Sequence, residues 1–294
     1  MYSEFFGLNE KPFSITPDPR YLYMTGRHSD ALAHLIYGIR ESGGFIQLTG
    51  EVGTGKTTLI RSLLENMPDA AKLAVILNPS LSALEFLAAI CVELDIDLPE
   101  EHTRSSLITV LNRYLLQAHA DGIRVVLVVD EAQTMDAVLL EQVRLLTNLE
   151  TTKQKLLQII LIGQPELREL LSRADMRQIA QRITGRFHLE PLSRGETRAY
   201  VRHRMRVAGA QHDVFMPGAM RALHQSSGGV PRLINVVADR ALLAAYTLDA
   251  PKISGRLVRR AAAEVFGGTR RRWWPYPVIG AIVLLLAAAL LPRP

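Results

Sequence analysis

The stretch FIQLTGEVGTGKTTL at residues 45–59 decides the fold, because an apolar run enters a glycine-rich turn and leaves it as a helix beginning near Lys56. Such a turn lets backbone N–H groups close around a polyphosphate, since glycine has no Cβ atom in the way. The following helix directs the positive end of its dipole at the anion, and the lysine ammonium reaches the β- and γ-phosphate oxygens. The Thr57 hydroxyl is expected to bind Mg²⁺. The predicted nucleotide-binding residues are Gly50, Glu51, Val52, Gly53, Thr54, Gly55, Lys56, Thr57 and Thr58.

A second stretch, RVVLVVDEAQ at residues 124–133, places two acids directly after an apolar run typical of a buried strand. Asp130 is expected to hold, through its water shell, the Mg²⁺ that Thr57 also binds. Glu131 is expected to orient and deprotonate the water that attacks the γ-phosphate. Two acids after a strand can also cap a helix, but the phosphate-binding loop in the same chain favours nucleotide chemistry. ATP and Mg²⁺ are therefore the predicted ligands.

The hydrophobic pattern predicts an α/β protein of the P-loop type, in which helices cover both faces of a parallel sheet. Strands are expected at 45–49, 73–77, 125–129, 157–162 and 188–192, and helices at 56–67, 82–94, 105–120 and 137–149. From residue 193 the alternation stops, and helices are expected at 193–207, 217–225, 231–246 and 254–265. The predicted domains are a nucleotide-binding core with an N-terminal strap (1–192), a helical lid (193–267), and an arginine-rich linker with a membrane span (268–294).

Two amides follow predicted strands at the sheet edge where the ligands of open parallel sheets bind. Asn78 follows the second strand and Gln164 the fourth. An amide there can hydrogen-bond the γ-phosphate, the attacking water or Glu131, so both are candidate nucleotide sensors. Asn78 precedes Pro79, and a role in forming the turn is an equal alternative for it.

Three arginines are candidates for contact with the γ-phosphate. Arg186 is the first choice and Arg182 the second for a residue that reaches the nucleotide of a neighbouring subunit and neutralises charge in the transition state. Arg232 lies in the first turn of a predicted lid helix, after two glycines, where it can report the nucleotide state to the lid. The alternative for each is a solvated surface charge.

Composition limits the classes of partner. The chain has 294 residues, a formal net charge of +5 and one cysteine, Cys91, in an apolar helical run. Much of the positive charge lies between Lys252 and Arg272, so a basic surface over the whole protein, as for general nucleic-acid binding, is disfavoured. A single cysteine forms no intramolecular disulfide, as expected for a reducing compartment.

The two ends of the chain differ sharply. Residues 1–23 carry aromatic side chains among prolines and are too polar for a signal peptide, and the aromatic groups either line the base pocket or cover the edge of the core. Residues 278–291, VIGAIVLLLAAALL, are apolar throughout, and counting from the aromatic residue Trp273 gives a stretch suited to a single membrane span. Arginines at 270–272 predict that everything before the span lies in the cytoplasm, with the span in the inner membrane. A buried core helix is the alternative.

These motifs, together with residues 1–23, LLTNLETTKQKLLQIILIGQPELREL, QRITGRFHLEPLS and GGVPRLIN, resemble the AAA+ ATPases of the general secretion pathway protein A (ExeA-like) family over residues 1 to about 266. The resemblance implies an AAA+ core with Gly50, Gly55, Lys56 and Thr57 as Walker A. It implies Asp130 and Glu131 as Walker B, Gln164 as sensor 1 and Arg232 as sensor 2. Arg186 or Arg182 would be the finger.

Members of that family join a cytoplasmic ATPase, an inner-membrane span and a periplasmic peptidoglycan-binding domain, and help install a secretin or related envelope machine. Only residues 292–294 follow the predicted span, so the periplasmic domain is expected to be missing. The resemblance implies a membrane-anchored, Mg-dependent ATPase that drives or regulates assembly of an envelope secretion, pilus or export complex as a homo-oligomer. The alternative is a DNA-associated AAA+ ATPase of the transposition or initiator type, although no helix-turn-helix or winged domain is evident after residue 266.

Overall fold

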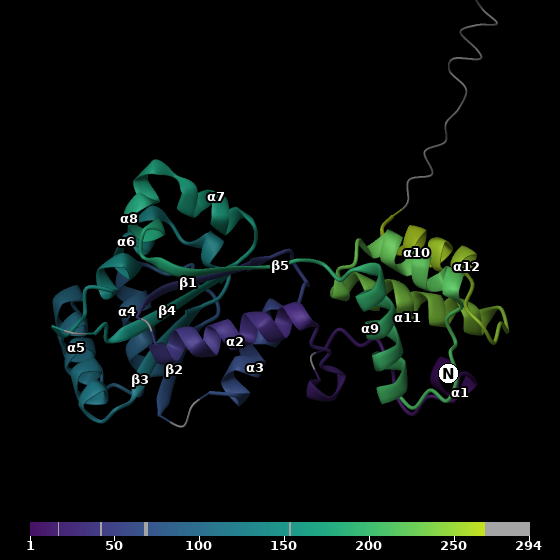
Figure 1. The fold of residues 1–294 in the computed structure, drawn as a ribbon, viewed down its shortest axis with the longest axis horizontal. Coiled ribbons are helices and arrows are strands. Elements are labelled where there is room, and N and C mark those ends of the chain that lie inside the picture. Colours follow the sequence, from purple (N-terminus) through teal and green to yellow (C-terminus); the bar gives the residue numbers. More distant parts are fainter. Residues whose placement is uncertain (17, 42, 68–69, 153, 268–294) are drawn as a thin grey trace, which may run out of the picture.

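The computed structural model describes residues 1–267 apart from 17, 42, 68–69 and 153, and the side chains of 40 and 41. Figure 1 shows two bodies side by side, a sheet with its helices and a group of helices, with the N-terminus beside the second body. The predicted membrane span at 278–291 lies outside the described residues. Among the residues that are described, no helix is both long and apolar enough to cross a membrane.

Five parallel strands form one sheet in the order β2-β3-β4-β1-β5. The strands are β1 (Gly44–Gly50), β2 (Ala71–Ile76), β3 (Arg124–Val129), β4 (Leu157–Gly163) and β5 (Ile183–Leu189). Every residue of β1 and β4 is buried, as the continuous apolar runs predict for central parallel strands. The predicted P-loop-type α/β sheet is therefore confirmed.

The prediction of a strand at 188–192 is wrong in position. β5 begins at Ile183 and ends at Leu189. Its residues from 183 to 188 alternate between half-buried and exposed positions because it is an edge strand, and Leu189 is buried. This edge strand has no continuous apolar run, so a search for buried strands did not find it. Pro191 lacks a backbone N–H and so fits poorly in the predicted strand.

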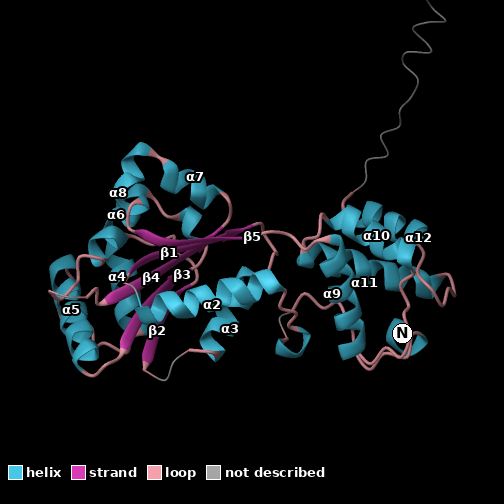
Figure 2. Ribbon diagram, in the orientation of Figure 1, coloured by secondary structure: helices cyan, strands magenta, loops and turns pink. Residues whose placement is uncertain are grey.

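Helices pack on both faces of the sheet, as Figure 2 shows. One face is covered by α4 (Ala83–Glu93), α5 (Arg104–Ala120), α6 (Ala137–Leu146), α7 (Glu166–Ser172) and α8 (Arg177–Ala180), whose apolar residues join one core with those of the strands. Cys91, in the apolar helical run noted above, is buried in this core. The other face is covered by α2 (Gly26–Glu41) and α3 (Lys56–Glu65). Short 3₁₀ turns lie at Pro19–Tyr21, Ala132–Thr134 and Ala174–Met176.

The second body consists of α9 (Arg194–Val207), α10 (Pro217–Ser227), α11 (Pro231–Thr247) and α12 (Gly255–Val265), close to the bounds predicted for the lid. The hydroxyl of Ser193 accepts the backbone N–H of Glu196, and the Glu196 carboxylate accepts the N–H of Ser193. This capping box fixes where α9 begins. Buried aliphatic residues such as Val201, Leu223 and Leu242 form the core of the lid.

The N-terminal strap packs with the lid. Tyr2, in the short helix α1 (Tyr2–Phe5), joins Phe13 and Tyr21 in the lid core, and the rings of Phe13 and Phe215 meet edge to face with centroids 5.9 Å apart. The strap then crosses to the sheet, where α2 begins at Gly26. An ion pair between Arg27 and Glu190 ties this crossing to the one that leads from β5 into α9.

The buried side chain of Arg204, on α9, fastens the strap to the lid. Its Nε donates to the carbonyl oxygen of Pro12 over 2.6 Å, and its Nη2 donates to that of Ser14 over 3.1 Å. Its Nη1 donates to the hydroxyl of Tyr200 over 3.1 Å, and the guanidinium carbon lies 4.6 Å from the ring centroid of Tyr21. A planar group with several donors is suited to this position.

Candidate active site

The phosphate-binding loop connects β1 to α3 at the carboxyl edge of the sheet. Gly55, the residue before α3, has φ +108°, and a Cβ atom there would lie 3.0 Å from Nε2 of His28. Gly53 has φ +83°, and a Cβ atom there would lie 2.5 Å from Cβ of Arg232 on the lid. Two reasons therefore favour glycine at both positions: the positive φ, and the lack of space for a Cβ atom beside a neighbouring side chain.

Lys56 lies in the first turn of α3 and is buried. Its ammonium donates to the carbonyl oxygens of Gly50, over 2.7 Å, and Glu51, over 3.1 Å. Burial lowers the pKa of Lys56, and the carboxylates of Glu131 and Asp130 oppose that shift. The ammonium is thus held inside the loop and faces the two acids that follow β3.

Asp130 and Glu131 follow β3 directly, as predicted. Asp130 is 6% exposed, and its Oδ1 accepts the backbone N–H of Glu131 over 2.9 Å. Burial raises the pKa of Asp130, while that hydrogen bond and the charge of Lys56 oppose the rise. Glu131 has φ +51° and ψ +34°, a left-handed conformation that is strained for a residue other than glycine and that is often found at functional sites.

Two glutamine side chains hold the Glu131 carboxylate. Gln164 Nε2 donates to Oε2 of Glu131 over 3.1 Å, and Gln133 Nε2 donates to the same oxygen. The backbone N–H of Gln164 in turn donates to Oε1 of Gln133 over 3.0 Å. Burial raises the pKa of Glu131, but these side-chain hydrogen bonds and the charge of Lys56 outweigh it, so the net pKa is lowered. Gln164 thus lies where a sensor was predicted, and Gln133, two residues after Glu131, was missed.

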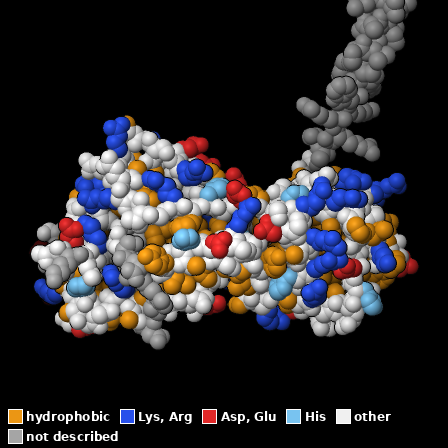
Figure 3. Space-filling view, in the orientation of Figure 1, with side chains coloured by type: hydrophobic (Ala, Val, Ile, Leu, Met, Phe, Trp, Pro, Cys, Tyr) orange, Lys and Arg blue, Asp and Glu red, His pale blue; other side chains and the backbone are white. Residues whose placement is uncertain are grey.

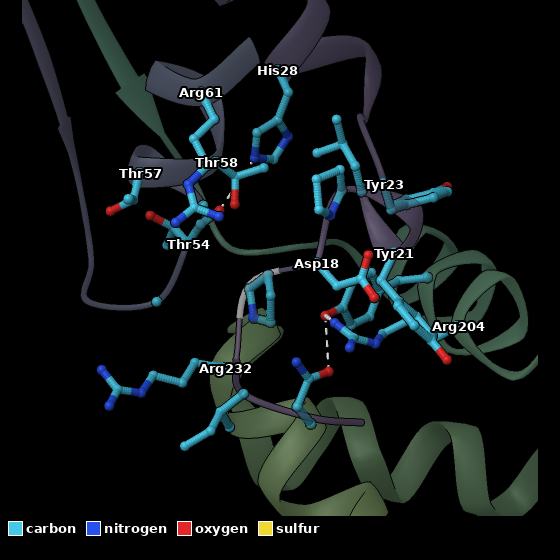
Figure 4. A pocket seen from close by; sticks show the side chains of 18 of the residues that line it. Asp18, Tyr21, Tyr23, His28, Thr54, Thr57, Thr58, Arg61, Arg204 and Arg232 are labelled. Carbon is cyan, nitrogen blue, oxygen red and sulfur yellow. Dashed lines mark hydrogen bonds between the residues drawn. The ribbon is translucent and has the colours of Figure 1, made fainter. Parts of the chain in front are cut away.

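A cavity of about 410 Å³ opens between the loop, the strap and the lid (Figure 4). Thr54, Thr57 and Thr58 line it from the loop and α3. Tyr21 and Tyr23 line it from the strap, whereas Phe13 of the strap is buried in the lid core. The lid contributes polar residues, namely Tyr200, Arg204, Arg232 and Asn235.

Arg232 occupies the first turn of α11, and its backbone N–H donates to the carbonyl oxygen of Gly53 over 3.4 Å. Its side chain is exposed. In Figure 4 it extends from the lid side of the cavity, with Thr54, Thr57 and Thr58 on the other side. The lid and the phosphate-binding loop are therefore in direct contact through the segment predicted to contain sensor 2.

His28, which the sequence analysis did not single out, binds the loop from the start of α2. Thr25 Oγ1 accepts the backbone N–H of His28 over 3.3 Å and lies 2.6 Å from its Nδ1. A hydroxyl that accepts from the backbone has its own proton to give to Nδ1, so the ring proton lies on Nε2. Nε2 then donates to the carbonyl oxygen of Thr54 over 3.2 Å. Burial lowers the pKa of His28, which keeps the ring neutral.

Three predicted site residues lie apart from the phosphate-binding loop and the acids that follow β3. Asn78 follows β2, the edge strand separated from β1 by β3 and β4, and its Oδ1 accepts the N–H of Ser80 over 3.2 Å, as in the turn alternative. Arg186 lies on β5, is exposed, and donates to the carbonyl oxygen of Ala180 over 2.9 Å. Arg182 donates to the side chains of Thr147 and, over 2.8 Å, Asn148 at the end of α6.

Comparison with known proteins agrees with this geometry. An AAA domain matches residues 39–171. Solved structures with a similar fold include Cdc6p of Pyrobaculum aerophilum (TM-score 0.67, 19% identity, 86% of this chain and 70% of that one) and the ORC2 protein of Aeropyrum pernix (TM-score 0.64, 17% identity, 87% and 71%). At these identities the likeness is one of fold alone.

The loop and the acids after β3 lie within the part of the chain that matches an AAA domain, and their arrangement is that of a P-loop nucleotide-binding site. The chain is related to General secretion pathway protein A of Aeromonas hydrophila, to which it is 50% identical over 291 residues. The match covers 99% of this chain and 52% of that protein, so the chain spans about half the length of this relative.

Proposed function

We propose that the chain is a membrane-anchored, Mg-dependent ATPase whose cycle drives or regulates assembly of an envelope secretion, pilus or export complex. The observation that carries the proposal is the cluster of Lys56, Asp130 and Glu131 at the end of β1 and β3, beneath a lid that touches the loop. The identity with a secretion-pathway protein supports the setting. The sheet body with its strap and the helical lid are proposed as two domains, with the boundary at residue 193.

The donor set fits Mg²⁺. The described residues contain no group of three or more His, Cys, Asp or Glu side chains suited to a metal ion. A magnesium ion in a phosphate-binding site needs no such group, because one or two side-chain oxygens, water and the phosphates complete its shell. Thr57 and Asp130 would supply those oxygens, and the ion would neutralise charge that develops on the phosphates.

The other roles in ATP binding and hydrolysis are assigned to side chains of the protein. Lys56 exchanges its carbonyl partners for phosphate oxygens, since its ammonium already lies within the loop. Glu131, held in the ionised form by Gln133 and Gln164, orients the attacking water and accepts its proton. Arg232 adds positive charge from the lid when the cavity closes over ATP. His28 positions the loop through the Thr54 carbonyl.

The trans-acting arginine is assigned to Arg186 rather than Arg182. Arg186 is exposed on an edge strand, whereas Arg182 donates to the side chains of Thr147 and Asn148 in its own chain. A residue that acts in trans requires head-to-tail contact between copies, so a homo-oligomer is part of the proposal.

Anchoring in the inner membrane rests on the apolar sequence at 278–291. The described surface supports it, because Lys and Arg side chains gather over the lid near α10 and α12 (Figure 3), where Arg256, Arg259 and Arg260 are exposed. A basic surface beside an anchor is attracted to anionic lipids on the cytoplasmic side. The fold likeness to ORC and Cdc6 proteins gives no support to DNA binding here, since it concerns the fold alone.

The test compares the full-length protein in lipid nanodiscs with its Lys56→Ala and Glu131→Gln variants. Lys56→Ala is expected to lose ATP binding, and Glu131→Gln to bind ATP with hydrolysis lowered by a factor of about 100 or more. In the native cells, Glu131→Gln is expected to reduce the number of assembled envelope complexes at equal protein level. Wild-type hydrolysis in either variant refutes the site, and wild-type assembly with an inactive site refutes the assembly role.

A further inference from the structure

A second cavity, of about 360 Å³, lies between β5, β1 and the helices α7 and α8. These helices stand on one face of the sheet (Figure 1). The cavity shares no lining residue with the one beside the phosphate-binding loop. We propose that it binds an oxyanion of the phosphate type. Its polar and charged lining residues are Gln47, Arg168, Ser172, Arg173, Arg177 and Arg186.

The lining has one sign of charge. Four arginines contribute to it, and no acidic residue does. Arg173 forms an ion pair with Asp175 over 2.8 Å. Within the described part of the chain, no carboxylate lies within 4.0 Å of the guanidinium nitrogens of Arg168, Arg177 or Arg186. Guanidinium groups gathered around one hollow, three of them without counter-charge, attract an anion and bind its oxygens through paired N–H donors.

The floor of the cavity supplies an independent observation. Gln47 lies in the middle of β1, directly opposite Arg186 in the register of β1 and β5, and is 4% exposed. Its Nε2 has no hydrogen-bond partner among the described residues. A buried amide without a partner is costly, and most such groups in folded proteins are satisfied by a ligand, water or protein atom. An oxyanion seated among the arginines would accept this hydrogen bond.

The chemistry favours phosphate over a metal ion. Guanidinium groups offer donors and no acceptors, so the lining suits a ligand with several acceptor oxygens. Two sources carry such a group: free inorganic phosphate or polyphosphate, and the triphosphate bound to a second copy of the chain. The second source rests on the proposed trans role of Arg186, whereas the first is independent of it.

The first arm of the test uses the full-length Lys56→Ala protein, in which the loop no longer competes for phosphate. Inorganic phosphate and tripolyphosphate are titrated into it by calorimetry. Binding of one equivalent is expected, weakened about tenfold by Arg177→Gln and by Gln47→Leu, since each removes donors to the anion. Arg113→Gln, an exposed arginine on α5, is the matched control and is expected to leave the affinity unchanged.

The second arm asks whether the anion belongs to a neighbouring copy. Lys56→Ala protein has an intact cavity and is expected to bind no nucleotide. It is mixed with an Arg168→Gln/Arg177→Gln double variant, which is expected to bind ATP but to hydrolyse it slowly. Restored hydrolysis in the mixture assigns the anion to the neighbour, and binding in the first arm without restoration assigns it to free phosphate. Two results together overturn the proposal. The first is that the Lys56→Ala protein binds neither anion, or that Arg177→Gln and Gln47→Leu leave its affinity for both anions unchanged. The second is that the double variant hydrolyses ATP normally. None of these outcomes depends on the assembly role.

Discussion

The side-chain amide of Gln164, at the end of β4, donates to Oε2 of Glu131, at the end of β3, over 3.1 Å. Gln133 donates to the same oxygen. Both bonds lower the pKa of Glu131 against the opposing effect of burial. We therefore expect Gln164→Leu to reduce the turnover number about tenfold while ATP affinity changes little, because the carboxylate is then less well oriented.

The same variant has a defined pH dependence. Loss of either amide raises the pKa of Glu131, so the acidic limb of the turnover profile moves to higher pH in Gln164→Leu and in Gln133→Leu. Turnover measured against pH under saturating ATP checks this. An acidic limb that stays in place in both variants would show that another group controls it.

The contact between Gly53 and the lid predicts a defect in ATP binding. A Cβ atom at Gly53 would lie 2.5 Å from Cβ of Arg232, so Gly53→Ala is expected to push the lid from the loop and weaken ATP binding at least tenfold. Gly122→Ala is the matched control, because Gly122 also has positive φ but has open space around it. It is expected to cost about 1 kcal/mol of stability through backbone strain with no change in ATP affinity. Equal ATP affinity in both variants would contradict the lid contact.

His28 offers a test of loop positioning. His28→Phe removes the hydrogen bond to the Thr54 carbonyl and keeps an aromatic ring, so ATP affinity is expected to fall about five- to tenfold. His34→Phe is the control on the same helix, since His34 is exposed and stacks on Phe187. A drop in affinity of the same size in both variants would argue against a role specific to His28.

Acid stability supplies a separate readout for the same residue. Burial lowers the folded-state pKa of His28, so the unfolded chain binds more protons and stability falls as the pH drops below about 6.5, the ordinary histidine value. His28→Phe is expected to flatten this fall without abolishing it, because burial also lowers the pKa of His203. Chemical unfolding at several pH values measures the slope. An unchanged slope would show that His28 does not titrate on unfolding.

Arg204 predicts how firmly the strap is held. Arg204→Met removes hydrogen bonds to Pro12, Ser14 and Tyr200, and is expected to cost about 2–4 kcal/mol in the free energy of unfolding. Limited proteolysis is expected to cut the strap earlier than in the wild type. Arg206→Met, exposed on the same helix, serves as the control and should behave as the wild type.

The sequence predicted most of this site because its motifs fix the local backbone. Gly55 and Lys56 begin a helix after a strand, and Asp130 directly follows another strand, so the parallel sheet brings them to one edge. Gln164 could be placed at this edge by the same reasoning. The distance of Asn78 from the loop could not be predicted, because the order of the strands is a tertiary property and β2 is the edge strand separated from β1 by β3 and β4.

Other parts of the site and the fold could not be predicted from the local sequence. His28 reaches the loop only because α2 lies across the sheet face beside α3, and nothing in its neighbouring sequence marks it as a ligand of a carbonyl oxygen. Gln133 stands in the quoted motif, but its bond to Glu131 depends on the left-handed conformation of that residue. Edge strand β5 lacks the apolar run that revealed the other four strands.

The chain passes between the sheet and the lid twice, once after Tyr21 and once after Leu189, and the pair Arg27–Glu190 holds these two passages together. Two adjacent connecting segments form a hinge with a single axis and oppose rotation about other axes. The orientation of the lid relative to the sheet is therefore limited even when the cavity is open. Since the first residues belong to the lid core, a force applied at Met1 acts on the lid before it reaches the sheet. Tyr2 and the strap residues that pack with it would therefore move together with the lid.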